Sequence, residues 1–212
     1  MMQPYHYNAS RYGAHNLILS AIEPRSVVLD VGCGPGYLAQ HCTAHNVSWY
    51  GIDVNAAYVE QARKFYTAAC VYDLNSSDQF PYEGVTFDTV LMADVLEHVV
   101  DPLAALSHAM GHVRPGGRVI ISLPNVAHFT VRFNLLRGRF DYGDSGILDR
   151  THLHLYTRDT ALALARQGGL VVKDVKYSSD RFGYVANHWP QLAGLLAFNI
   201  VLYAVKPSKD DN

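Results

Sequence analysis

The stretch VVLDVGCGPGYLA at residues 27–39 decides the fold, because it joins an apolar strand to a glycine-rich turn and the start of a helix. Its three glycines occupy every second position, at Gly32, Gly34 and Gly36. The dinucleotide fingerprint G-x-G-x-x-G needs a glycine at position 37, where this chain has Tyr37. The Gly-Lys-Ser/Thr ending of a Walker loop is also missing. The turn is therefore predicted to bring its backbone close to a ligand without holding a pyrophosphate.

Outward from this turn, apolar runs of strand length alternate with segments of helix length. Strand-like runs occupy residues 26–31, 47–54, 69–74, 87–93, 118–124, 170–178 and 198–207. Helix-like segments occupy residues 36–45, 56–66, 102–113 and 158–169. This alternation favours a parallel sheet whose connecting helices cover both faces. We predict an α/β fold, a three-layer sandwich on a seven-stranded, mostly parallel, Rossmann-like sheet.

Composition limits what this chain can be. Its 212 residues suit a single domain with a full core, residues 1–212. A net charge of −2 and a pI near 6.6 provide no basic surface for nucleic acid. The N-terminus lacks a secretory apolar core, and the longest apolar run, residues 192–205, is too short to span a bilayer. Three cysteines without a CxxC pair fit a reducing compartment, so we expect a cytoplasmic protein with no membrane or nucleic-acid partner.

Two segments stand outside the alternating pattern. Residues 125–156 are rich in histidine, arginine and aromatic residues, and they follow the fifth strand. Ligands of open α/β folds bind at the carboxyl edge where this segment starts, so we expect a substrate-region insertion there. Residues 1–25, with Tyr5, Tyr7 and Tyr12, are expected to form a lid over the ligand, or alternatively a loosely packed helix.

Three carboxylates on successive strands indicate which ligand the turn holds. Asp30 points at the ligand from the first strand, where its charge would repel a pyrophosphate and attract an ammonium group. Asp53 ends the second strand, where an acidic residue accepts from ribose hydroxyls. Asp73 follows the third strand and can accept from an adenine amino group. An amino acid, a ribose and an adenine without phosphates describe S-adenosylmethionine.

At five motifs the chain resembles the class I S-adenosylmethionine-dependent methyltransferases. VLDVGCGPG, YGIDVN, VYDLN, FDTVLMADVLEHVVDP and VRPGGRVIISLPN match the family's motifs in order, from about residue 26 to residue 125. The resemblance implies a transferase enzyme whose last strand runs antiparallel. The stretch from residue 122 onward is similar to the MetW-like and type-11 and type-12 groups, many of which serve cell-surface sugar or natural-product pathways.

The motifs also assign the residues that hold the cofactor. The expected cofactor-binding residues are Asp30, Gly32, Gly34, Gly36, Asp53, Val54, Asp73, Leu74 and Ala93. Arg11, in the N-terminal segment, is expected to pair with the methionine carboxylate, as N-terminal arginines do in some relatives.

DVLEHV, after the fourth strand, contains the first candidates for chemistry. In a helical turn Asp94, Glu97 and His98 share one face, and two carboxylates with an imidazole can hold a divalent cation. A metal-dependent branch of the family, with small-RNA 2′-O-methyltransferases and ubiquinone-pathway O-methyltransferases, resembles this with Glu-x-x-Glu-His. In the small-RNA enzymes a downstream histidine matches His152. The predicted Mg²⁺ or Mn²⁺ set is Asp94, Glu97, His98 and His152; the alternative is that Glu97 and His98 only orient the loop.

Without a metal, histidines are the candidates for a general base, because imidazole titrates near neutrality. The candidate catalytic histidines are His98, His128, His152 and His154, each of which also fits an ordinary hydrogen-bonded role. Nearby arginines can hold an anionic acceptor or pair with local aspartates; they are Arg132, Arg137, Arg139, Arg150 and Arg158.

These observations predict an S-adenosylmethionine-dependent methyltransferase that acts on a small-molecule acceptor, at oxygen. Two alternatives stay open. One is a non-catalytic MetW-like partner protein of a biosynthetic enzyme, for which the apolar residues 188–198 supply a homodimer or partner surface. The other is a metal-dependent ribose 2′-O-methyltransferase, which the charge balance disfavours.

Overall fold

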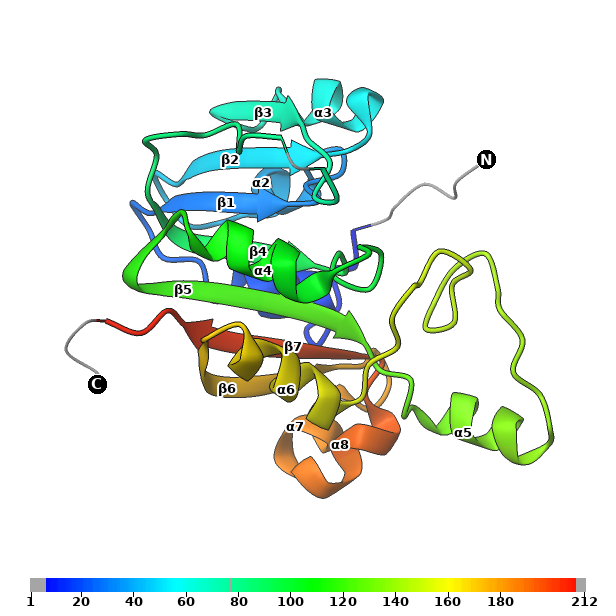
Figure 1. Cartoon of the computed structure of the whole chain (residues 1–212). Coiled ribbons are helices and arrows are strands. Elements are labelled where there is room, and N and C mark those ends of the chain that lie inside the picture. The colour runs from blue at the N-terminus through cyan, green and yellow to red at the C-terminus, as the bar shows by residue number, and fades with distance from the viewer. Residues whose placement is uncertain (1–6, 77, 209–212) are drawn as a thin grey trace.

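The computed structural model describes residues 7–76 and 78–208, and within them a seven-stranded sheet carries helices on both faces (Figure 1). The strands are β1 (Val27–Val31), β2 (Ser48–Asp53), β3 (Ala68–Val71), β4 (Phe87–Ala93), β5 (Val113–Pro124), β6 (Val171–Ser178) and β7 (Asn199–Val205). Their order is β3-β2-β1-β4-β5-β7-β6. β7 is antiparallel to β5 and β6, and the other neighbours are parallel. The predicted sheet, with its antiparallel last strand, is confirmed.

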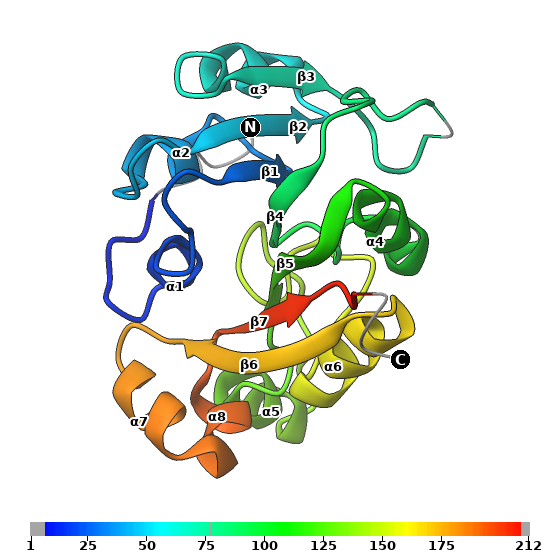
Figure 2. The same ribbon diagram turned by 90° about the vertical axis from the view of Figure 1, so that its left-hand side faces the viewer.

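Helices cover the two faces of this sheet. They are α1 (Ala14–Leu19), α2 (Tyr37–His41), α3 (Ala56–Ala62), α4 (Pro102–Met110), α5 (Phe129–Leu136), α6 (Arg158–Gln167), α7 (Gly183–His188) and α8 (Pro190–Leu196). Figure 2 shows α1, α2 and α3 on one face and α4 and α6 on the other. β1 serves both layers because its side chains alternate: Val28 packs toward α1–α3, while Leu29 and Val31 pack toward α4 and α6. A bilayer-spanning helix does not occur in the described part of the chain.

The glycine turn is held between β2 and the loop after β4. The N–H groups of Gly32 and Cys33 both donate to the carbonyl of Ile52, at 2.8 and 3.0 Å. Gly32 has a φ of +70°, and a Cβ at this position would lie 2.4 Å from Val95 Cγ2. Glycine is required here for its backbone conformation and for the close approach of Val95.

The structure departs from the predicted elements in β5 and in α5. β5 begins at Val113 instead of residue 118, because the sheet pairs Val113 and then Arg118 while the Pro-Gly-Gly sequence bulges out between them. Gly116, at a φ of +70°, allows this bulge. α5 lies inside residues 125–156, the segment outside the alternating pattern, where no helix was predicted. Val131 is its buried residue.

The substrate-region insertion leaves and rejoins the body at one place, which we call the stalk (Asn125 and Tyr156). These two residues form an isolated parallel bridge, and the N–H of Val126 donates to the Tyr156 carbonyl at 2.8 Å. The Asn125 amide is tied to α8 through the carbonyls of Gly194 and Ala197. Figure 1 shows α5 and the loop after it standing away from the sheet beyond this stalk.

The N-terminal segment before α1 runs from α2 to the segment that follows β6. Tyr5 lies outside the described residues. The ring of Tyr7 stacks on those of His41 and His15, with centroids 3.9 and 5.4 Å away. The carbonyl of Tyr12 accepts a hydrogen bond of 3.0 Å from the segment that follows β6. The function of this segment as a lid stays a prediction.

Two glycine substitutions test the geometry of the turn. Gly32→Ala should lower the free energy of unfolding by about 2–4 kcal/mol, since a left-handed conformation and a clash with Val95 add together. Gly34→Ala, at a φ of +51° with no atom within 4 Å of its Cβ, should cost only about 1–2 kcal/mol. Urea unfolding measures both, and equal losses would contradict the Val95 contact.

Candidate active site

Asp53, at the carboxyl end of β2, is fixed by the main chain on both sides. Its two carboxylate oxygens accept from the N–H groups of Gly34, at 2.9 Å, and Asn55, at 2.8 Å. The carboxylate therefore sits between the glycine turn and the start of α3. Since each oxygen can accept a second hydrogen bond, the arrangement fits the predicted contact with ribose hydroxyls.

The centre of the turn leaves open space beside Asp53. A Cβ added to Gly34 would meet no atom within 4 Å. Val54 is 67% exposed, so it offers apolar surface to a ligand, while Leu74 and Ala93 are half-buried. An adenosyl group needs hydrogen-bond acceptors for its ribose, a close backbone and apolar surface for its base. Asp53, Gly34 and Val54 offer these along one edge. These residues fit S-adenosylmethionine.

Asp73 and Asn75 connect the loop after β4 to the edge of β1–β3 that carries the predicted cofactor residues, which we call the cofactor half. Asp73 Oδ1 accepts from the main-chain N–H and the side-chain amide of Asn75, at 2.8 and 3.0 Å. Asn75 Oδ1 accepts from the N–H of Val100 at 2.8 Å. Asp73 is exposed, so its carboxylate can also accept from a ligand, as the predicted adenine contact requires.

Asp30 lies beneath the turn instead of at its surface. It is buried, and the Tyr66 hydroxyl donates to its Oδ2 at 2.5 Å. Its Oδ1 has no hydrogen-bond partner among the described residues. Burial raises the pKa of Asp30 to about 7, against the lowering effect of the Tyr66 hydrogen bond. A cationic group above the turn would favour the ionised form, but Asp30 is buried and its contact with the ammonium group of the ligand stays a prediction.

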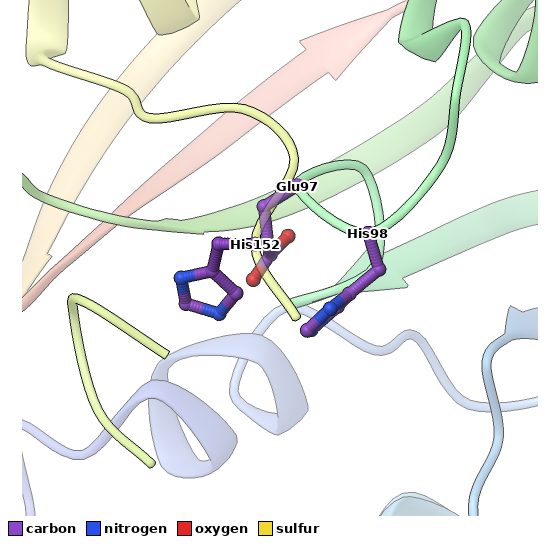
Figure 3. Close-up of side chains that lie close together, drawn as sticks. All are labelled: Glu97, His98 and His152. Atoms are coloured by element: carbon purple, nitrogen blue, oxygen red, sulfur yellow. The ribbon is translucent and has the colours of Figure 1, made fainter. Parts of the chain in front are cut away.

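Glu97, His98 and His152 converge at the carboxyl edge of β4, as Figure 3 shows. One ligand atom from each lies within 4.8 Å of the others. Glu97 is fully buried, and neither of its carboxylate oxygens has a hydrogen-bond partner among the described residues. Burial, with a smaller contribution from Asp94, holds the pKa of Glu97 well above its usual range. A buried carboxyl without partners, facing two imidazoles, is a donor set suited to a cation.

The two imidazoles are oriented by main-chain carbonyls. Nδ1 of His152 lies 3.0 Å from the Ile147 carbonyl, and Nδ1 of His98 lies 3.2 Å from that of Thr151. A proton on each Nδ1 completes these hydrogen bonds, which leaves each Nε2 free to act as a ligand. Burial lowers the pKa of His152 and so favours the neutral imidazole that binds metals.

The main chain of Glu97 brings His152 into this cluster. Its carbonyl accepts from the N–H groups of Leu153, at 2.8 Å, and His154, at 3.1 Å. The predicted helical turn at DVLEHV is instead a non-helical turn, in which the N–H of His98 donates to the Val95 carbonyl at 3.0 Å.

Asp94 does not belong to the cluster, which corrects the predicted set of four ligands. Its backbone has a φ of +54°, and its Oδ1 accepts from Ser122 Oγ, at 2.8 Å, and Asn199 Nδ2, at 2.7 Å. The left-handed backbone turns the carboxylate toward β5 and β7, where it links three strands. The structure therefore brings together Glu97, His98 and His152 alone among the four predicted ligands.

Two of the candidate catalytic histidines are engaged elsewhere. His128 caps α5: it is buried, its Nδ1 lies 2.7 Å from Thr130 Oγ1, and its ring contacts those of Phe129 and Phe198. Nε2 of His154 lies 3.2 Å from the Val100 carbonyl. These contacts assign both side chains to the architecture of the loops.

The arginines form ion pairs, a hydrogen bond to a main-chain carbonyl, or contacts with aromatic rings. Arg150 pairs with Asp144 at 3.0 Å, and Arg158 with Asp159 at 3.3 Å, both at the surface. Arg132 donates to a main-chain carbonyl, and Arg137 lies over an aromatic ring. Arg11 lies over the ring of its neighbour Tyr12, at 5.5 Å, and its contact with the methionine carboxylate stays a prediction.

Three polar residues that sequence reasoning missed hold these groups in place: Tyr66, Asn75 and Asn199. Asn75 stands inside the motif VYDLN, so its place beside Asp73 could have been noticed. Tyr66 and Asn199 carry no local signal, since each reaches its carboxylate from an element distant in sequence, at separations of 36 and 105 residues.

Residues 5–175 match a family model described as a methyltransferase domain. The chain belongs to this methyltransferase family. Among curated relatives, the ubiquinone biosynthesis O-methyltransferase of Pseudomonas fluorescens is 30% identical over 162 residues, 70% of this chain and 66% of that one. The enzyme of the same name from Alkalilimnicola ehrlichii is 35% identical over 116 residues, 50% of this chain and 44% of that one. The chain thus spans less than two thirds of the length of these relatives.

Solved structures of low sequence identity share the fold. An S-adenosylmethionine-dependent methyltransferase from Aquifex aeolicus matches with a TM-score of 0.62 and 18% identity, covering 94% of each chain. A second match is a chain from the complex between the Haloferax volcanii Trm112 methyltransferase activator and a putative methyltransferase. Its TM-score is 0.66 and its identity 16%, and the match covers 91% of this chain and 89% of that one. The predicted methyltransferase family and the predicted fold are therefore confirmed.

Asp53→Ala should weaken binding of S-adenosylhomocysteine at least tenfold, because the ribose loses its acceptors and the Gly34 N–H of the turn loses the carboxylate to which it donates. Glu60→Ala, which removes an exposed carboxylate of α3, is the matched control and should bind normally. Calorimetric titration compares them. Unchanged affinity of Asp53→Ala would remove Asp53 from the cofactor site.

Asp30→Asn tests the buried carboxyl through the pH dependence of stability. The folded pKa of about 7 exceeds the ordinary 3.8, so the stability contributed by Asp30 is full at low pH and is lost as pH rises from about 4 to 7. The variant keeps an acceptor for Tyr66. Its gain in unfolding free energy over the wild type should be greater at pH 8 than at pH 5, by about 2–3 kcal/mol. Equal differences at the two pH values, in urea titrations, would refute the raised pKa.

Proposed function

We propose that this methyltransferase moves a methyl group from S-adenosylmethionine to an oxygen atom of a small-molecule acceptor, beside a divalent cation held by Glu97, His98 and His152. The observation that carries the proposal is the buried Glu97 carboxyl, whose oxygens have no described partner and which faces two imidazoles. The relatives named ubiquinone biosynthesis O-methyltransferases support transfer to oxygen.

In this reaction the sulfonium–methyl bond breaks as the oxygen–methyl bond forms in line, and the hydroxyl proton leaves the acceptor. The leaving group is already activated, so positioning supplies much of the rate. Asp53 and Gly34 hold the nucleoside end of the cofactor. When His98 and His152 hold the cation through Nε2, the hydroxyl proton leaves to solvent; without a cation, the Nε2 of either imidazole would take it.

The donor set favours Mn²⁺ over Mg²⁺. With Asp94 turned away, two of the three protein donors are imidazole nitrogens. Mg²⁺ prefers oxygen ligands, whereas transition metals accept imidazole readily. When bound, such a cation supplies Lewis-acid chemistry that lowers the pKa of an acceptor hydroxyl.

The acceptor is proposed to be a hydroxylated small molecule of a cell-surface sugar or natural-product pathway. The similarity of the segment after residue 122 to the MetW-like and type-11 and type-12 groups supports this class. A non-catalytic partner protein and a ribose 2′-O-methyltransferase are the competing functions. The first predicts no methyl transfer to any acceptor, and the second predicts transfer to a ribose 2′-hydroxyl.

Glu97→Gln should abolish binding of Mn²⁺ or weaken it at least tenfold, because it replaces the only carboxylate of the cluster by a neutral amide. Glu83→Gln, at an exposed position, is the control for loss of one charge. Calorimetry and the electron paramagnetic resonance spectrum of Mn²⁺ provide readouts that need no acceptor.

The same titrations with S-adenosylmethionine, first in EDTA and then with Mn²⁺ or Mg²⁺, separate the parts of the proposal. Cofactor binding without any Mn²⁺ binding would remove the cation and leave His98 and His152 as bases. Absence of cofactor binding under all conditions would favour the partner protein.

A further inference from the structure

The insertion and α8 expose large apolar side chains outside the cofactor and cation residues. We call this region the α5–α8 surface; it comprises Phe129, Phe133, Leu136 and Leu195, which line one groove. Leu136 is 86% exposed and Phe133 is 57% exposed. Single exposed apolar residues are ordinary, but a gathering of them marks a surface that binds something.

α5 presents its apolar stripe outward. Phe129, Phe133 and Leu136 follow one another at spacings of four and three residues, which places them on one helix face. In a helix of a soluble core this stripe would be buried, but here it lines an open groove of about 660 Å³ shared with Leu195 of α8. Val131 is the residue by which α5 contacts the core.

Cationic side chains border this stripe. Arg132 lines the same groove, and Arg137 lies 5.3 Å from the Phe133 ring centroid. Arg139 follows one residue after the left-handed Gly138. Within residues 7–76 and 78–208, none of these three arginines forms an ion pair with a carboxylate. The surface is therefore apolar and bordered by arginines that have no carboxylate partner among the described residues.

We propose that the α5–α8 surface docks onto a bilayer that contains anionic lipids. Aromatic and aliphatic side chains beside arginines are the composition of helices that lie in the membrane interface. Arginines without carboxylate partners complement anionic headgroups. A second copy of the chain fits less well, since a two-fold contact would gather the arginines of both copies, without carboxylate partners, in one interface. The composition of the whole chain does not reveal this surface, because its apolar residues are confined to the insertion and α8.

The test is co-sedimentation of the full chain with vesicles of phosphatidylcholine alone or with 30% phosphatidylglycerol. The protein should bind the anionic vesicles, and added salt should weaken binding. Arg137→Gln with Arg139→Gln should lower the partition coefficient about 25-fold, at about fivefold for each charge. Leu136→Ser should lower it about tenfold or more.

Val171→Ser is the matched control for Leu136→Ser. Val171 is 42% exposed and begins β6 at the end of the sheet opposite the insertion, so its replacement should leave vesicle binding unchanged. Circular dichroism and S-adenosylhomocysteine binding establish that the variants fold.

Three results would overturn the proposal. They are absence of binding to anionic vesicles, equal binding to neutral ones, and wild-type binding by the α5–α8 variants. Light scattering after gel filtration adds a further decision. A dimer that Leu136→Ser converts to a monomer, with no vesicle binding, would assign the surface to a second copy of this chain.

Discussion

The carboxyl group of Glu97 is the constraint on which the carboxyl edge of the sheet depends. It is buried without a described hydrogen-bond partner, an arrangement that costs on the order of 1–3 kcal/mol when nothing compensates it. The main chain of the same residue accepts from Leu153 and His154. The loop after β4 and the insertion therefore cannot separate without losing these bonds, and the segment that carries His152 stays against the group that needs a partner.

The loop after β4 also belongs to the cofactor half of the site. Val95 lies against Gly32 of the turn, and the Val100 N–H donates to Asn75 beside Asp73. Glu97 stands between these two contacts in sequence. The turn and the cluster of Glu97, His98 and His152 are thus joined by short, direct contacts, so any coupling between a cofactor and the proposed cation would be reciprocal.

Sequence patterns predict the sheet well because its strands are apolar, buried and regularly spaced, and the end of β2 places Asp53 without further information. The orientation of Asp94 could not be predicted. Its left-handed backbone is uncommon for an aspartate, and the partners that stabilise it, Ser122 and Asn199, come from distant strands. α5 was also missed, because its helical spacing extends over only eight residues within a segment rich in histidine, arginine and aromatic residues.

The stalk at Asn125 and Tyr156 makes the insertion an exchangeable module. Both ends of the module meet at a single bridge, so a segment of another length can replace it while β5 and α6 keep their places. His152 travels with the module, whereas Glu97 and His98 remain on the sheet. Under the proposed function, exchange of this module would alter the acceptor region and remove one cation ligand together, while Asp53 and the glycine turn keep their places.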